Sequence, residues 1–206
     1  MAGRAARPPE AAQDRAGDRV RRGARALSEP LRVAFVCTGN RFRSPLAAAL
    51  LAAEAEGLAV EIASLGTLDL GPEPALPEAV AIARELGLDL SGHRARSIRA
   101  GELRDHNLVV GFERKHVVAS VVDGGAAVER TFTLPELTAL LGEPEPGSSG
   151  GAQGRIRRAH ERRPLDFRNA PLAELRDPLG LSAPEQREIA RRLEGLVDRL
   201  AAALFD

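Results

Sequence analysis

The 206-residue chain has little sulfur and few aromatic rings: one cysteine, Cys37, and six phenylalanines, with no tryptophan and no tyrosine. A single cysteine excludes a disulfide framework and a structural zinc site built on cysteine thiolates. No apolar run reaches the roughly 18 residues that a membrane-spanning helix needs, and charged residues make up 28% of the chain. The sequence therefore predicts a protein without a membrane span.

The chain also lacks a net charge, because 29 acidic side chains balance 29 basic ones. Without a basic excess we expect no nucleic-acid partner, and without an apolar segment we expect no membrane partner. The N-terminal region has no apolar core of a secretory signal, so we expect a cytoplasmic protein. Lys115 is the only lysine among the basic residues, a bias typical of GC-rich bacterial genomes.

Two regions differ sharply in composition. Residues 1–30 carry seven arginines and four acids with almost no large apolar side chains. They cannot bury enough surface to offset the entropy of ordering, so we expect a disordered tail. Residues 31–206 have the apolar side chains for one domain. Within it, residues 143–154 are rich in Pro, Gly and Ser and predict a flexible insertion around 143–165.

The arginine-rich stretch 155–163 lies in that insertion and has five arginines and one glutamate. It predicts one or two helical turns, or a continuation of the loop. We expect a solvated helix face, with binding of an acidic partner or a phosphorylated polymer as the alternative.

Short apolar runs alternate with helical patterns along the rest of the domain. This alternation predicts an α/β fold in which a mostly parallel sheet is covered by helices on both faces. The expected strands are residues 31–37, 60–64, 107–112 and 128–133. The expected helices are residues 44–57, 74–87, 113–122 and 134–142, and a last one that follows a capping box formed by Ser182 and Glu185.

The loop after the first strand has the composition of a nucleophile held in an anion-binding site. Ligands bind at the carboxyl ends of parallel strands, which is where this loop lies. Backbone N–H groups from Thr38 onward, together with a helix N-terminus, would attract an oxyanion and favour the thiolate of Cys37. Arg43 offers a planar pair of donors that matches two oxygens of a tetrahedral anion. Ser44 can donate to the thiolate and cap the following helix.

Three other loop residues are candidates for shaping or binding. Gly39 and Asn40 tolerate the left-handed backbone that a closed loop of this size requires. Arg41 is expected to be exposed, where it faces solvent or presents charge to a substrate.

A cysteine that displaces a phosphoryl group needs an acid to protonate the leaving oxygen. Asp177 is the best candidate, because Pro178 fixes the backbone directly after it, and Asp166 is the alternative. We expect His93 and His116 to make structural hydrogen bonds. The remaining two histidines, at positions 106 and 160, are expected at the surface.

The pattern Val36-Cys37-Thr38-Gly39-Asn40-Arg41-Phe42-Arg43-Ser44-Pro45 resembles the low-molecular-weight protein tyrosine phosphatase family, whose fold is shared by thioredoxin-type arsenate reductases. The likeness continues through residues 64–67, 87–96 and 112–116 and closes with Asp177-Pro178 before the terminal helix. It covers residues 31–206, with the insertion as an addition.

The resemblance implies a three-layer α/β/α domain with a four-stranded parallel sheet, flavodoxin-like, in the strand order 2-1-3-4. It implies a two-step hydrolysis that uses no metal and no cofactor. Cys37 would form a phosphocysteine, with Asp177 as general acid and then as base. Arg43 and the loop N–H groups would hold the phosphoryl oxygens, Asn40 would shape the loop, and Ser44 would help the thiolate leave.

Three departures from the family pattern bear on the substrate. Phe42 stands where the family often has a second cysteine, so an oxidised Cys37 has no partner in the chain. Leu179 stands where the family often has an aromatic residue that lines the slot for a phosphorylated ring. Phe42 is then the nearest candidate for a wall of that slot. The usual Ser-Ala-Gly-Thr is Ser-Leu-Gly-Thr at residues 64–67, which we interpret as a packing change.

We therefore expect a phosphatase that acts on a phosphorylated protein, with phosphotyrosine as its target, or on a small aryl phosphate. An arsenate reductase that uses a low-molecular-weight thiol is one alternative, since it needs only one cysteine. A protein that binds phosphate or another oxyanion without turnover is the other. A monomer is the simplest expectation for its oligomeric state.

Overall fold

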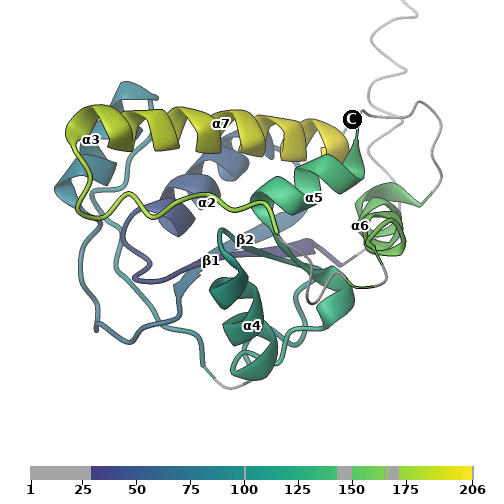
Figure 1. Ribbon diagram of the computed structural model, residues 1–206. Coiled ribbons are helices and arrows are strands. Elements are labelled where there is room, and N and C mark those ends of the chain that lie inside the picture. The colour runs from purple at the N-terminus through teal and green to yellow at the C-terminus, as the bar shows by residue number, and fades with distance from the viewer. Residues whose placement is uncertain (1–28, 100, 143–149, 165, 167–171, 206) are drawn as a thin grey trace, which may run out of the picture.

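Four short apolar segments form a parallel sheet, as the sequence predicts. In the computed structural model these are β1 (Leu31–Cys37), β2 (Val60–Gly66), β3 (Leu108–Gly111) and β4 (Thr131–Thr133), in the order β2-β1-β3-β4 (Figure 1). The structure describes residues 29–99, 101–142, 150–164, 166 and 172–205. The expected disordered tail, apart from residues 29 and 30, and most of the Pro/Gly/Ser loop lie outside the described residues.

The strand register brings the carboxyl ends of all four strands to one edge of the sheet. Cys37 at the end of β1 pairs with Gly66 at the end of β2, and Gly111 at the end of β3 pairs with Thr133 at the end of β4. The loop that follows Cys37 therefore starts at the edge where parallel sheets bind ligands.

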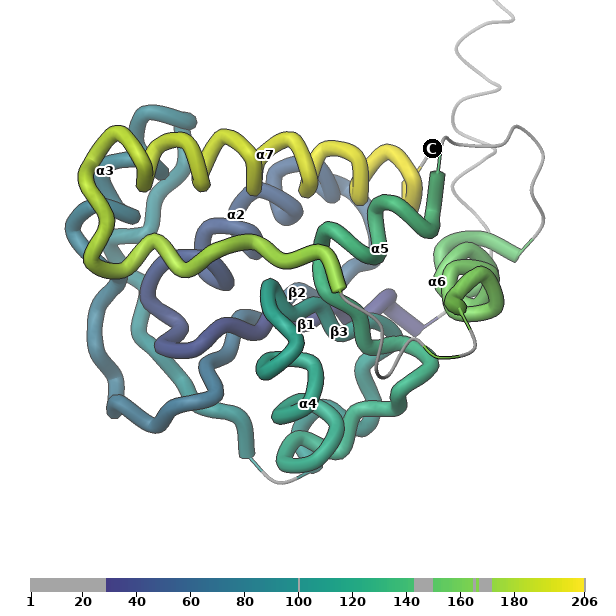
Figure 2. Tube along the Cα trace, viewed as in Figure 1, coloured from purple at the N-terminus to yellow at the C-terminus, as the bar shows by residue number. Residues whose placement is uncertain are grey.

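Helices cover both faces of the sheet, which gives the predicted three layers. One face carries α2 (Arg43–Glu54), α3 (Pro77–Glu85), α5 (Leu134–Leu141) and α7 (Ala183–Phe205), and the other carries α4 (Arg114–Val122) (Figure 2). The helix α6 (Gly151–Glu161) lies beside α5 and α7 at the β4 side of the domain.

The larger hydrophobic core lies between the sheet and the four helices of the first face. Phe35 of β1, Leu46 of α2 and Leu193 of α7 are all fully buried there. The long helix α7 contributes Leu193, Val197, Leu200 and Leu204, a three-to-four-residue spacing that keeps one stripe of the helix against the core. None of the described helices is long and apolar enough to cross a membrane.

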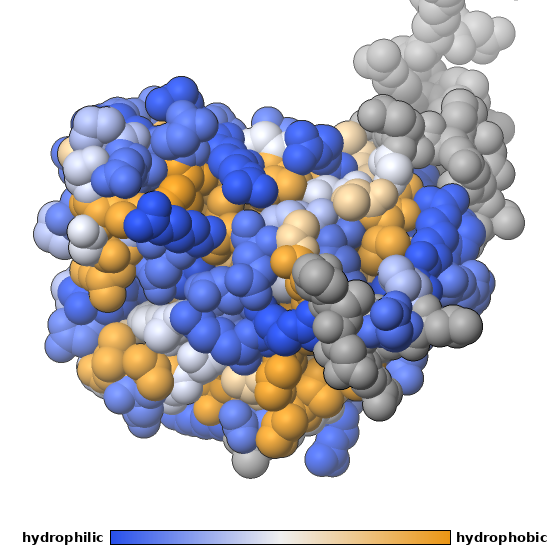
Figure 3. Space-filling model, in the orientation of Figure 1, coloured by the Kyte–Doolittle hydropathy of each residue, from blue (hydrophilic) through white to orange (hydrophobic). Residues whose placement is uncertain are grey.

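The second face has a smaller core and exposed apolar side chains. Val36, Val109 and Leu103 are buried in it. Figure 3 shows apolar surface over α4, where Val118 and Val122 are exposed. The expected strand at 128–133 is half as long as predicted, because residues 128–130 form a turn of 3-10 helix and only Thr131–Thr133 pair with β3.

The arginine-rich stretch forms the second half of α6 and the two residues after it, and the expected solvated face is present at Arg157 but not at Arg163. Arg163 is buried and pairs with Glu136, with its guanidinium 3.8 Å from the centre of the Phe132 ring. Arg155 donates to a carbonyl in the last turn of α7, and Arg162 donates to two carbonyls at the end of α5. These arginines hold α6 against the domain, since the ends of helices leave carbonyl groups without helical partners.

Candidate active site

Cys37 ends β1 and is 3% exposed. Its Sγ lies 3.0 Å from Ser44 Oγ, and the backbone N–H of Asn40 donates to Sγ at 3.2 Å. A sulfur that accepts from a backbone N–H and lies beside a hydroxyl is well placed to carry a negative charge.

Ser44 has one hydroxyl hydrogen and two acceptors for it. Its Oγ can donate to the carbonyl of Leu65 at 3.2 Å or to Cys37 Sγ, and it accepts a hydrogen bond from the Asn40 side chain at 2.9 Å. A thiol can donate to this oxygen, whereas a thiolate must accept from it. Ionisation of Cys37 therefore turns the Ser44 hydroxyl hydrogen from the Leu65 carbonyl to Cys37 Sγ. The expected capping role of Ser44 is wrong, because α2 begins at Arg43 and Phe42 occupies its N-cap without a side-chain cap.

Asn40 holds the loop in shape from its centre. Its φ of 52° is left-handed, as expected. Its side-chain amide donates to Ser44 Oγ and to Ser64 Oγ, and its side-chain oxygen accepts from the backbone N–H of Arg96 at 2.9 Å. Its backbone carbonyl lies 2.6 Å from His93 Nε2. The loop is therefore tied to β2, and also to the segment 93–96.

Gly39 does not need backbone freedom, which corrects our expectation. It does not have the positive φ of Asn40, but a Cβ on it would lie 3.2 Å from Leu70 Cδ1. Arg41 is less exposed than expected. Its Nε donates to the carbonyl of Pro74 at 2.8 Å, and its Nη2 lies 3.8 Å from Glu73.

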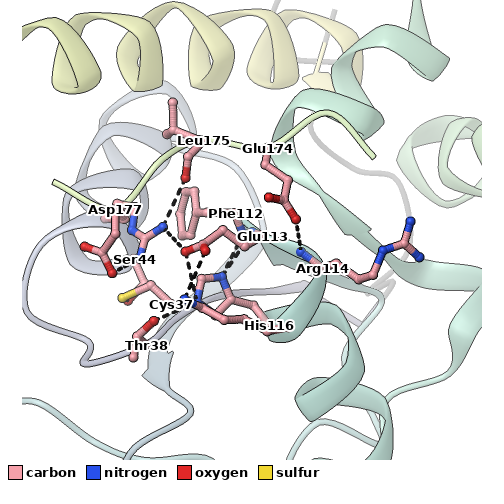
Figure 4. A network of polar contacts seen from close by, with 12 residues as sticks. Cys37, Thr38, Ser44, Phe112, Glu113, Arg114, His116, Glu174, Leu175 and Asp177 are labelled. Carbon is pink, nitrogen blue, oxygen red and sulfur yellow. Dashed lines mark hydrogen bonds and ion pairs between the residues drawn. The ribbon is translucent and has the colours of Figure 1, made fainter. Parts of the chain in front are cut away.

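Arg43 gathers the charged groups of the site, and the structure brings Asp177 to it from 134 positions away. Its side chain is 2% exposed, and its Nη2 donates to Asp177 Oδ2 at 2.5 Å. Its Nη1 donates to Glu113 at 2.6 Å and to the carbonyl of Leu175 at 3.0 Å. Figure 4 shows this network beside Cys37. Asp166, the alternative acid, is exposed and takes no part in the contacts that the structure gives for Arg43.

Sequence reasoning missed Glu113, the residue after the buried segment that ends β3. Partial burial would raise the pKa of this carboxyl, but hydrogen bonds from Arg43 and Lys115 and the positive charge of Arg43 outweigh it, so the pKa lies below its ordinary value. Glu113 is therefore a carboxylate that orients Arg43. The only signal was its place: a charged residue directly after a buried strand at the ligand-binding edge.

Phe42 does not form the expected wall of a substrate slot. Its side chain is 4% exposed and packs in the larger core, so the ring offers little surface to a substrate. Exposed apolar side chains beside the loop include Leu70, which lies near Gly39, and Leu179, whose N–H donates to Asp177 Oδ1 at 3.1 Å.

His93 and His116 make hydrogen bonds to the loop, as expected, through Asn40 and Thr38 respectively. Burial is the main cause that lowers the pKa of His93 below its ordinary value. In the described part of the chain, no group of three or more His, Cys, Asp or Glu side chains is arranged to hold a metal ion.

The chain is thus a doubly wound α/β protein with a cysteine in a closed loop at the ligand-binding edge of its sheet and an arginine that joins that loop to a distant aspartate. The family model for low molecular weight phosphotyrosine protein phosphatase matches residues 32–139, just over half of the chain. The chain belongs to this family. The matched stretch contains Cys37, Arg43 and Glu113 but ends before Asp177.

Curated relatives carry two different substrate names. Wzb of Escherichia coli (strain K12), a low molecular weight protein-tyrosine-phosphatase, is 40% identical over 85 residues, which are 41% of this chain and 56% of Wzb. The chain thus spans about half the length of this relative. A protein-arginine-phosphatase of Geobacillus stearothermophilus is 28% identical over 176 residues, which are 85% of this chain and 97% of that protein.

Solved structures have the same fold over most of the chain. The low molecular weight protein tyrosine phosphatase from T. tengcongensis superposes with a TM-score of 0.61 at 29% identity, covering 82% of this chain and 97% of that one. A structure of the YwlE arginine phosphatase, a cysteine-to-serine mutant with a phosphorylated active-site serine, superposes with a TM-score of 0.60 at 26% identity, covering 82% and 93%.

Proposed function

We propose that this protein is a cysteine-dependent phosphatase that hydrolyses phosphotyrosine in proteins. The observation that carries the proposal is the position of Arg43, which follows the Cys37 loop and binds the carboxylate of Asp177. A phosphoryl group held by Arg43 would have a nucleophile on one side and a carboxyl group within reach of its leaving oxygen.

The reaction has two balanced steps. In the first, the Cys37 thiolate forms a bond to phosphorus, the bond from phosphorus to the ester oxygen breaks, and Asp177 gives its proton to the leaving oxygen. In the second, Asp177 takes a proton from water, whose oxygen bonds to phosphorus while the sulfur leaves as a thiolate. The phosphorylated serine of the YwlE mutant supports a covalent intermediate at this position of the fold.

Ser44 and Glu113 support these steps without touching the leaving group. The Ser44 hydroxyl lies 3.0 Å from Cys37 Sγ and can donate to the thiolate as it leaves. Glu113 keeps Arg43 in place when a phosphoryl group replaces Asp177 at Nη2, because its bond is to Nη1.

An aromatic phosphate is favoured as substrate by the apolar side chains beside the loop. Leu70 and Leu179 are both exposed, Leu70 near Gly39 and Leu179 hydrogen-bonded to Asp177. They could contact a phosphorylated ring in place of aromatic side chains. Phosphoarginine is the second candidate substrate, supported by the arginine phosphatase that aligns over 85% of the chain.

The test is hydrolysis of a small aryl phosphate from pH 5 to pH 8, followed by phosphotyrosine and phosphoarginine peptides. We expect a bell-shaped profile, because turnover needs an ionised Cys37 together with a protonated Asp177. Cys37→Ser should abolish turnover, and Asp177→Asn should reduce it by about 10²–10⁴-fold.

Asp166→Asn is the matched control, since it makes the same change at the other candidate acid, and it should leave turnover unaltered. Full activity in Cys37→Ser, or a flat pH profile, would contradict the mechanism. A folded wild type that only reduced arsenate in the presence of a small thiol, or only bound oxyanions, would show that one of the two alternative functions is correct.

A further inference from the structure

His116 is a fully buried polar side chain in the first turn of α4, next to the nucleophile loop. Its close approach to the sheet depends on Gly111 at the end of β3, where a Cβ would lie only 2.9 Å from His116 Cβ. The fold therefore reserves space for this imidazole at the ligand-binding edge.

The hydrogen bonds of His116 define which ring nitrogen carries the proton. The backbone N–H groups of Phe112 and Glu113 both donate to Nδ1, at 3.3 and 3.1 Å. An acceptor nitrogen cannot carry hydrogen in the neutral ring, so the proton is on Nε2. Nε2 lies 3.0 Å from Thr38 Oγ1 and must donate to it (Figure 4).

The imidazole ring of His116 is neutral at every pH from 5 to 8. Burial, and then the positive charge of Arg43, lower the pKa of His116 to about 3, against an opposing effect of Glu113 and a further lowering by Lys115. His116 is therefore a fixed hydrogen-bond donor rather than a proton carrier.

Thr38 is the residue directly after the nucleophile, and its own carbonyl accepts from the backbone N–H of Leu68 at 3.0 Å. With one lone pair of Oγ1 occupied by His116, the hydroxyl hydrogen of Thr38 points elsewhere and is available to an anion. We propose that His116 is a positioning residue: through Thr38 it orients the first peptide after Cys37 and leaves the Thr38 hydroxyl to donate to a bound oxyanion. For turnover this inference depends on the proposed function, but for anion binding it does not.

Two substitutions separate this role from a purely structural one. His116→Asn keeps an acceptor near the position of Nδ1 for the N–H groups of Phe112 and Glu113 but loses the donor to Thr38. His116→Gln places a donor near the position of Nε2 and can still reach Thr38. The probes are orthovanadate and inorganic phosphate, whose binding is measured by calorimetry, together with kcat and KM for an aryl phosphate.

We expect His116→Asn to weaken vanadate and phosphate binding about tenfold, which corresponds to one ordinary hydrogen bond. His116→Gln should restore most of the affinity. Thr38→Val should cause a similar loss, and the double variant should be no worse than Thr38→Val alone, because both changes remove one interaction. His106→Asn is the matched control, since His106 is a half-buried histidine before β3, at the opposite edge of the sheet, and should change nothing.

Unchanged anion affinity in His116→Asn, with only a lower melting temperature, would overturn the inference, as would losses that multiply in the double variant. Failure of the proposed function looks different. In that case the wild type binds vanadate without hydrolysing phosphate esters, and the His116 variants still report on binding.

Discussion

Two arginines are buried in this domain with nearly the same kinds of neighbour, but their carboxylate partners differ in exposure. Arg43 and Arg163 both pair with a glutamate, both donate to a backbone carbonyl and both lie over a phenylalanine ring. The carboxylate partner of Arg163 is buried, since the Glu136 side chain is 9% exposed. Around Arg43 one partner, Asp177, has a side chain that is 36% exposed.

The difference shows what distinguishes a site from a structural ion pair. Arg163 binds both oxygens of Glu136 as well as the carbonyls of Val128 and Thr131, so its donors are used by groups that cannot leave. Arg43 holds Glu113 with one nitrogen, while the other holds the carboxylate of Asp177, which a phosphoryl group replaces in the mechanism that we propose. A buried cation becomes a binding group when one of its partners is exchangeable.

The strongest test of this comparison is the same substitution at both positions. Arg43→Met should lower kcat/KM for an aryl phosphate by at least about 10²–10³-fold, the usual effect of removing a group that stabilises transition-state charge. Its cost in stability should be small, because Asp177 can turn to solvent and Glu113 keeps Lys115. Steady-state kinetics together with urea unfolding would measure both.

Arg163→Met should show the opposite pattern. It leaves Glu136 buried without its cation, and such losses cost about 3–5 kcal/mol. We expect a free energy of unfolding reduced by that amount and an unchanged kcat/KM for the folded fraction at low temperature. A variant that kept its stability but lost activity would show that α6 contributes to the site, and the comparison would fail.

Acid should reveal a smaller difference between the two arginines. The pKa of His116 is lowered from 6.5 to about 3 in the folded protein, so the unfolded chain takes up its proton first. Stability from this group is full above about pH 6.5 and is lost as the pH falls toward 3, by at most about 1.4 kcal/mol per pH unit. Arg43→Met should flatten this dependence, since Arg43 helps to lower that pKa, and Arg163→Met should retain it. Urea unfolding at a series of pH values measures the slopes.

Much of the fold could be predicted because local patterns and global topology agree. The run 31–37 has the β-branched composition of a buried strand, and the stripe of α7 is visible in the spacing of its leucines. Where a segment is short and mixed, the pattern fails. Residues 128–133 have strand-forming residues at both ends, but only the last three reach β3.

The site was predictable only where its residues are close in sequence or carry a family pattern. Cys37 and Arg43 share one loop, and Asp177 was expected from its Asp-Pro turn. Glu113 was not expected, because it can bind Arg43 only when β3 pairs with β1 and brings the two residues together. Arg163 was misjudged for a related reason: charge composition does not show whether a guanidinium finds a carboxylate and carbonyls within the domain.

The hydrogen bonds of Asn40 have a consequence for how an anion binds. The protein's own groups hold the loop in shape, because its one left-handed residue is hydrogen-bonded to Ser44, Ser64, His93 and Arg96. Little conformational entropy then remains to be lost on binding, and more of the gross interaction with the anion appears as affinity. Loosening Asn40, as in Asn40→Ala, should therefore make the entropy of vanadate binding less favourable, because the anion would have to order the loop itself.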